Sequence, residues 1–181
     1  MLLVFACSGE PACASEPDAV YLRYEVSGGP GLRFITAQVT LSLSGTGYSL
    51  VVNAETRGLA DFFAGMRSRL EARGRISGDT LYPEEMRTET HQVGTDFYAR
   101  THYWPDGMVS AEASPPPGSS VTPVTPAQMR GTIDQLSAYL ALARHLAIRG
   151  SCALVLAVFD GRRRYDLSFT DLPPESVSGF T

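Results

Sequence analysis

The sequence predicts a mainly β protein of the α+β type. Its long curved antiparallel sheet, a half-barrel or β-spiral, packs on one amphipathic helix around residues 132–149. Three observations support this prediction. Apolar and polar residues alternate with period two in many segments, turn-forming residues separate these segments, and one long segment follows the helical period. One helix among many antiparallel strands is typical of a sheet that curls around or against that helix.

The alternation predicts the first three strands at residues 20–26, 37–44 and 48–55. Each of them places its apolar side chains on one face, as a half-buried strand requires. The Gly45-Thr46-Gly47 segment predicts a hairpin turn between the second strand and the third. Residues 59–63, with two phenylalanines, predict a short turn of helix after them.

Residues 66–77 show the clearest alternation. Charged residues occupy every second position, namely Arg67, Arg69, Glu71, Arg73 and Arg75. A strand gathers all five on one face, whereas a helix would spread them around its circumference. We interpret this face as a solvated strand surface; the alternative is an anion-binding stripe.

Three more strands are expected at residues 81–93, 95–104 and 108–114. A hairpin that turns at about Val93-Gly94 places Asp96 opposite His91. The same register places Glu85 opposite His102, so the two imidazoles stand roughly 20 Å apart. A metal shared by these histidines is therefore not expected.

The chain then changes character. Prolines and serines in residues 114–126 predict a surface linker. A helix follows, with Thr132 as its N-cap, Gln135 completing a capping box and Gly150 at its C-terminal end. Its apolar stripe is formed by Leu136, Leu140, Ala143 and Ala147, widened by Tyr139, Leu142 and Leu146.

A last hairpin is expected in residues 152–170. Its first strand, residues 152–159, is nearly all apolar, which is typical of a strand covered on both faces. Asp160-Gly161 is the pair that a two-residue type I′ loop prefers. The three arginines that follow lie on both faces of the second strand, so they form a charged rim and do not converge on one point.

Composition excludes several classes of protein. The chain has 181 residues, 44% of them hydrophobic, and a formal net charge of −4, which indicates a globular domain without the basic excess of a nucleic-acid binder. We therefore expect no nucleic-acid partner. No apolar run approaches the roughly 20 residues that a transmembrane span needs.

The first fourteen residues, MLLVFACSGEPACA, differ from the rest. A short apolar run precedes Ala12-Cys13-Ala14, a cleavage motif of the A-x-A type, without a basic segment before it. We expect residues 1–14 to be a truncated signal peptide and residues 15–181 to form a single β-rich domain. The protein would then be exported to the periplasm. A lipoprotein linked through Cys7 and a disordered tail are the less favoured alternatives.

The sequence offers no catalytic, cofactor or metal site. No nucleophile elbow, zinc-binding helix, phosphate-binding loop or dinucleotide-binding motif is present. Cys152 has only His145 near it in sequence, seven residues earlier, which is a weak indication of a nucleophile and its base. Adjacent Glu84 and Glu85 are expected on opposite faces of a strand and so form no catalytic pair. We therefore expect a protein that is not an enzyme and binds no cofactor.

Six segments carry a resemblance to a known family. They read YLRYEV, AETRGLADFF, LYPEEMRTET, WPDG, RGTIDQLSAYLAL and GSCALVLAVFDGRRRYDLSFTDL. The most specific of them are the helix start and the last hairpin. Together they resemble an uncharacterised family of bacterial envelope proteins, domain of unknown function 3108, over most of the chain after the leader.

This resemblance implies export to the periplasm and a long curved sheet. It also implies kinship with β-spiral envelope proteins and with the half-barrel of lipoprotein carriers of the LolA/LolB type. Such proteins continue past the FTDL strand with further strands and a second cysteine, a disulfide partner for Cys152. We therefore expect this chain to lack C-terminal strands and that partner.

Two functional hypotheses follow. The first is a non-catalytic envelope protein that binds a lipid, an acyl chain or a hydrophobic peptide in a groove between sheet and helix. The expected groove residues are Val39, Leu41, Leu50, Val52, Leu70, Leu136 and Leu140. The second is a structural or protein-interaction module of the envelope whose own helix fills that groove. An apolar space left beside the helix would favour the first hypothesis.

Overall fold

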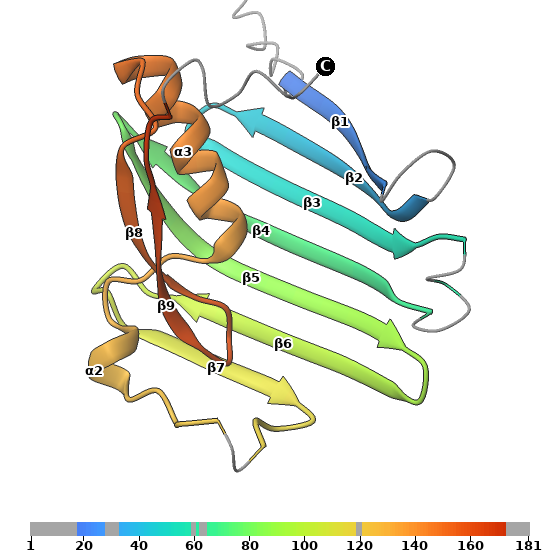
Figure 1. Cartoon of the computed structure of the whole chain (residues 1–181). Helices are drawn as coiled ribbons and strands as arrows, with labels where there is room; N and C mark the ends of the chain where they lie inside the picture. The colour runs from blue at the N-terminus through green and yellow to red at the C-terminus, as the bar shows by residue number, and fades with distance from the viewer. Residues whose placement is uncertain (1–17, 28–32, 59–60, 62–64, 119–120, 173–181) are drawn as a thin grey trace, which may run out of the picture.

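The computed structural model describes residues 18–27, 33–58, 61, 65–118 and 121–172. Seven strands form one antiparallel sheet in chain order (Figure 1). They are β1 (Asp18–Ser27), β2 (Arg33–Ser44), β3 (Gly47–Thr56), β4 (Arg67–Ser77), β5 (Thr80–Gln92), β6 (Thr95–Tyr103) and β7 (Val109–Ser114). The remaining described elements are the helices α2 (Pro126–Met129) and α3 (Gln135–Arg149) and the strands β8 (Leu154–Phe159) and β9 (Arg164–Phe169), which pair as a separate hairpin.

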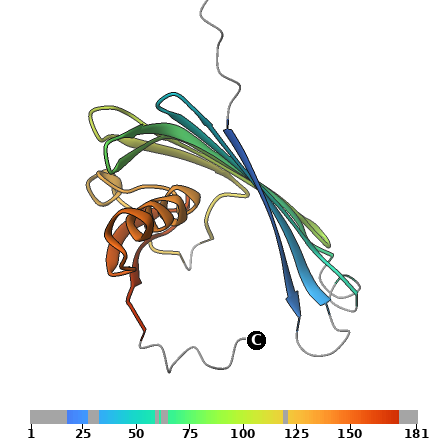
Figure 2. The same cartoon turned by 90° about the horizontal axis from the view of Figure 1, so that it is seen from above.

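The seven-stranded sheet is curved, and α3 and the β8–β9 hairpin lie together on its concave side, near one end of the strands (Figure 2). The predicted fold class, a curved antiparallel sheet packed on one amphipathic helix, is confirmed. Tight turns join β2 to β3, β4 to β5 and β5 to β6, each leaving two residues between the last paired positions. The predicted register of the β5–β6 hairpin is also confirmed, with His91 opposite Asp96 and Glu85 opposite His102.

A β-bulge interrupts the β4–β5 pairing. Arg73 pairs with Glu85 while the next residue, Gly74, pairs with Pro83, so Glu84 is the extra residue. A Cβ atom on Gly74 would lie 2.3 Å from the Tyr82 carbonyl oxygen, so only glycine fits there. The bulge also tolerates Pro83, which has no N–H to give to the ladder.

The bulge corrects the prediction for the two adjacent glutamates. Glu84 accepts a hydrogen bond from Arg75, and Glu85 accepts one from Arg73. Both arginines belong to the charged face of β4, so both carboxylates lie on that face. An extra residue shifts the alternation by one position, and period-two counting misses this shift.

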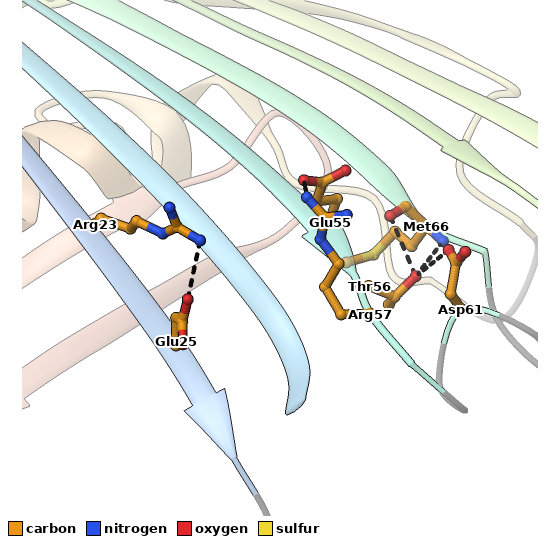
Figure 3. A network of polar contacts seen from close by, with 7 residues as sticks. All are labelled: Arg23, Glu25, Glu55, Thr56, Arg57, Asp61 and Met66. Carbon is orange, nitrogen blue, oxygen red and sulfur yellow. Dashed lines mark hydrogen bonds and ion pairs between the residues drawn. The ribbon is translucent and has the colours of Figure 1, made fainter. Parts of the chain in front are cut away.

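Thr56 holds the connection between β3 and β4 (Figure 3). Its hydroxyl donates to the Asp61 carboxylate at 3.1 Å and accepts from the Met66 backbone N–H at 2.9 Å. Its own backbone N–H donates to the Met66 carbonyl at 3.0 Å. Apart from Asp61, the helical turn predicted at 59–63 lies outside the described residues.

A short helix, α2, follows the predicted linker and shares only Pro126 with it. Thr125 caps it with a capping box that includes Gln128, and Pro126 occupies the first turn, where no N–H is needed. The linker prediction was therefore wrong only at Pro126, and sequence analysis did not predict this helix. The pattern was missed because four residues are too few to show a helical period.

Helix α3 begins later than predicted. Its N-cap is Asp134, whose side chain accepts from the Ser137 backbone N–H, and the Thr132 hydroxyl donates instead to the Met129 carbonyl. The predicted end is confirmed, because Gly150 closes the helix in the left-handed conformation with φ of 66°. Thr132 and Asp134 are both good capping residues, and the local pattern did not separate them.

The buried face of α3 also differs in part from the predicted stripe. Leu136 is buried and Leu140 half-buried, as expected, but Ala143 and Ala147 are exposed. Ser137 and Ala138 are fully buried instead. The helix packs both on the large sheet and on β8, so its contact surface is rotated from a single apolar stripe.

The β8–β9 hairpin corrects two further expectations. Phe159 pairs with Arg164, so four residues, not two, form the loop, and the Asp160 side chain accepts the backbone N–H groups of Arg162 and Arg163. Strand β8 is not covered along both faces, because Val155 is 65% exposed. The Tyr103 hydroxyl donates to the Phe159 carbonyl at 3.0 Å and ties the hairpin to the large sheet.

A buried chain of hydrogen bonds docks α3 on the sheet. The Tyr48 hydroxyl of β3 lies 2.6 Å from Ser137 Oγ, and Ser137 Oγ donates to Asp134 Oδ2 at 2.5 Å. Asp134 and Ser137 have no exposed surface. Burial raises the pKa of Asp134, and the hydrogen bonds from Ser137 only partly oppose this rise.

Asp134→Ala removes the acceptor of two buried hydrogen bonds and should lower the free energy of unfolding by about 2–4 kcal/mol. Asp134→Asn is the matched control, because its amide oxygen still caps the helix and the Ser137–Tyr48 hydrogen bond can reverse direction. Urea unfolding measures both variants. A loss for the Ala variant no larger than for the Asn variant would contradict a capping role for the side-chain oxygen.

The same pair of proteins has an expected pH dependence. Folding raises the pKa of Asp134. The wild type therefore loses stability as the pH rises from the pKa of Asp134 in the unfolded chain through its higher pKa in the folded protein. The Asn variant carries no such proton. Its stability relative to wild type should therefore be more favourable at pH 7 than at pH 3.

Candidate functional site: the concave face of the sheet

The concave face is lined with apolar side chains because alternate residues of the first four strands point to it. The strand register places these side chains in rows across the sheet. One row runs from Leu22 through Val39 and Val52 to Leu70. The next row runs from Val20 through Leu41 and Leu50 to Ala72.

The structure brings all seven predicted groove residues into one apolar cluster. Leu50 and Leu136 are buried at its centre, between sheet and helix. The other five are half-buried around them, namely Val39, Leu41, Val52, Leu70 and Leu140. The grouping therefore exists, but its centre is filled by the protein's own helix.

The apolar face continues past the elements that cover it. On β1, Val20, Leu22 and Tyr24 are 45%, 46% and 54% exposed. Val20 and Leu22 belong to the two rows above, and Tyr24 begins the next row. Sequence reasoning did not include these three residues in the groove. The signal was present, because their alternation with polar residues already placed them on one face of the predicted strand.

The next row towards the far end of the sheet carries small side chains. Beyond Tyr24 of β1, it runs from Ala37 through Ala54 and Ser68 to Thr90. The hydroxyls of Ser68 and Thr90 satisfy each other at 2.8 Å. The side chains of this row therefore project only a short way from the sheet, and the two hydroxyls need no further hydrogen-bond partner. Such a row can contact an apolar surface.

A separate apolar pocket of about 260 Å³ lies beside the helix. Its walls come from α3, β8 and the start of β5, and include Leu81, Ala141, Ile148, Leu154 and Leu156. His145 and Arg149 stand at its polar side together with Asp79, to which Arg149 donates at 3.4 Å. The helix therefore leaves apolar space on this side as well.

The opposite, convex face carries charged side chains, most of which form ion pairs with one another. Glu85 is nearly buried and accepts hydrogen bonds from Arg73, Arg87 and Arg100 at 2.5–2.7 Å. Burial alone would raise the pKa of this carboxyl, but the three arginine hydrogen bonds outweigh it and lower the pKa to about 2. The arginine stripe is thus part of an ion-pair network, which agrees with a solvated strand face.

The histidines and the cysteine that were considered as metal-binding or catalytic residues do not form one site. His91 lies 2.9 Å from the Asp96 carboxylate, whereas His102 packs edge-on against Trp104. Cys152 is a free, half-buried thiol. Among the residues that the structure describes, no group of three or more His, Cys, Asp or Glu side chains could hold a metal ion.

Asp171 closes the open end of the β8–β9 hairpin. Its carboxylate accepts from the Ser151 hydroxyl and from the Cys152 backbone N–H, both at 2.6 Å. The Ser151 hydrogen bond is the main cause that lowers the pKa of Asp171, followed by that of Cys152. In this arrangement the backbone, not the thiol, of Cys152 is engaged.

Together these features define a mainly β protein whose curved sheet presents one charged face and one apolar, partly open face. The chain belongs to the family described as "Protein of unknown function (DUF3108)", which matches residues 23–180. No curated protein and no solved structure matches it significantly. None of the helices in the described part of the chain is long and apolar enough to cross a membrane.

Glu85→Gln should lower the free energy of unfolding at pH 7 by about 1–3 kcal/mol, because three charged hydrogen bonds lose their carboxylate. Since the folded pKa of Glu85 is depressed, its contribution is complete above the unfolded value of 4.5 and disappears as pH falls towards about 2. The difference between variant and wild type should shrink over that range. Chemical unfolding at several pH values measures it.

The matched control is Glu89→Gln on the same strand, an exposed position. It should change stability by less than about 0.5 kcal/mol at every pH. An equal loss for the two variants would show that the ion-pair network around Glu85 adds nothing beyond an ordinary surface charge.

Proposed function

We propose that this protein is a non-catalytic binding protein of the bacterial cell envelope that takes up a lipid, an acyl chain or a hydrophobic peptide on its concave face. One observation carries the proposal. The apolar rows of the sheet extend onto β1, where Val20, Leu22 and Tyr24 remain about half exposed. Contiguous exposed apolar surface of this kind is typical of a binding site.

The energetics favour an apolar ligand. Fully burying a side chain such as Val, Leu or Tyr contributes roughly 1.5–3 kcal/mol relative to leaving it in water. A ligand that lies along the exposed rows would bury three of these side chains together and gain part of that free energy from each. The pocket between α3 and β8 adds a second apolar surface with His145 and Arg149 at its polar side.

The alternative is a structural or protein-interaction module of the envelope with no small ligand. The observation in its favour is that α3 and the β8–β9 hairpin already fill one end of the concave face. We favour ligand binding because that filling stops short of β1.

The proposed compartment is the periplasm. Its support is the leader-like pattern of the first fourteen residues, which lie outside the described part of the chain. The proposed kinship with lipoprotein carriers rests on the sequence resemblance.

Native mass spectrometry of the protein after export to a bacterial periplasm tests ligand and compartment together. We expect a mature chain that begins after Ala14 and carries a co-purifying acyl species that organic extraction removes. An apo-protein with that same N-terminus would support export and favour the interaction module. An uncut chain that remains in the cytoplasm would contradict export.

Leu22→Glu should weaken binding of the fluorescent probe cis-parinaric acid by at least about tenfold, because it places a charge in the middle of the exposed apolar rows. The matched control is Tyr21→Glu. Tyr21 is the neighbouring residue, 75% exposed, and lies on the charged face of the same strand. Equal affinity of both variants would exclude the concave face as the binding surface.

A further inference from the structure

Strand β1 is an open edge of the sheet. Within the described part of the chain its only hydrogen-bonded neighbour is β2, and residues 18–25 are all exposed. A ten-residue edge leaves a row of backbone N–H and C=O groups that can pair with another strand. Such an edge is a place for strand addition.

The other edge of the sheet, strand β7, is shorter and partly covered. Strand β7 has only six residues, and α2 lies beside it (Figure 1). The Arg162 guanidinium donates to the carbonyls of Ser114 and Pro115, where that strand ends. A short strand and a covering element are usual means by which proteins block an edge. Strand β1, in contrast, has ten residues, and in the described part of the chain only β2 pairs with it.

The charges of β1 are self-complementary. Arg23 and Glu25 lie two positions apart on the charged face and pair with each other at 3.0 Å (Figure 3). If two copies of β1 pair antiparallel about Tyr24, Arg23 of each copy faces Glu25 of the other. Pairing centred on residue 23 or 25 would instead put like charges opposite each other, which destabilises a sheet.

We propose that two copies of this chain associate through their β1 strands, antiparallel and centred on Tyr24. The two sheets then continue into one another across a two-fold axis. Arg23 and Glu25 form two ion pairs between copies on the charged face, and the two Tyr24 rings meet on the apolar face. This interface closes on itself, so it yields a dimer and not a fibre.

Engineered disulfides test the register. In a background with Cys7, Cys13 and Cys152 replaced by Ser, Tyr24→Cys places the two thiols at the two-fold axis. Opposite residues there have Cα atoms about 4.5–5.5 Å apart, which a disulfide can bridge. Mild oxidation should convert this variant to a covalent dimer.

Val20→Cys is the matched control, on the same face of the same strand and similarly exposed. In the proposed register the two copies of residue 20 lie eight positions apart along the strand, roughly 27 Å. This variant should stay monomeric on a reducing-agent-free gel. Cross-linking of both variants to the same extent, or of neither, would overturn the proposed interface.

Charge variants test the association without a cross-link. Sedimentation equilibrium of the wild type should show a dimer, and Glu25→Arg should raise its dissociation constant at least about tenfold, because four arginines then meet. The double variant Arg23→Glu with Glu25→Arg restores opposite charges across the axis and should restore the dimer. A wild type that remains monomeric, or a double variant as weak as the single one, would overturn the proposal.

The dimer is independent of the proposed ligand. Arg23 and Glu25 lie on the charged face, so these variants should bind cis-parinaric acid as the wild type does. Loss of dimerisation with retained probe binding would contradict the dimer alone. A wild type that dimerises but does not bind the probe would contradict the ligand proposal alone.

Discussion

The position of α3 on the sheet depends on one buried hydrogen-bonded chain. Asp134 caps the helix, its second oxygen accepts from the Ser137 hydroxyl, and that hydroxyl meets Tyr48 of β3. Room for the Tyr48 hydroxyl comes from Gly74, where a Cβ atom would lie 2.7 Å from it. A carboxyl with no exposed surface is stable only with such partners, so the helix has one docking position.

That docking position determines which part of the concave face stays open. A helix of 15 residues is about 22 Å long, whereas strands β1 to β5, with 10–13 residues each, extend about 33–43 Å. The seven strands side by side span roughly 30 Å. One helix and one hairpin at one end therefore cannot cover the whole face. The uncovered part includes the apolar side chains of β1, and this mismatch in size underlies both the proposed binding face and the open edge.

The side chains on the two faces of the sheet are stabilised in different ways. On the convex face, nearly every arginine of β4 has a carboxylate partner, and Glu85 joins three arginines from three strands. This network keeps a highly charged face close to neutral. On the concave face the same alternation delivers aliphatic side chains, which gain stability only when something covers them.

The sequence by itself determined the strands and the tight turns of the large sheet and, away from the bulge, the face on which their side chains lie, because period-two alternation is a local property of the backbone. It even placed His91 opposite Asp96, since a tight turn sets the register of a hairpin. Only the tertiary structure decided which cap began α3, which helix face was buried, and that a bulge put Glu84 and Glu85 on one side. These depend on contacts between distant segments. The seven predicted groove residues lie in one apolar cluster, because the strand alternation places them on one face. The open surface on β1, in contrast, depends on where α3 docks.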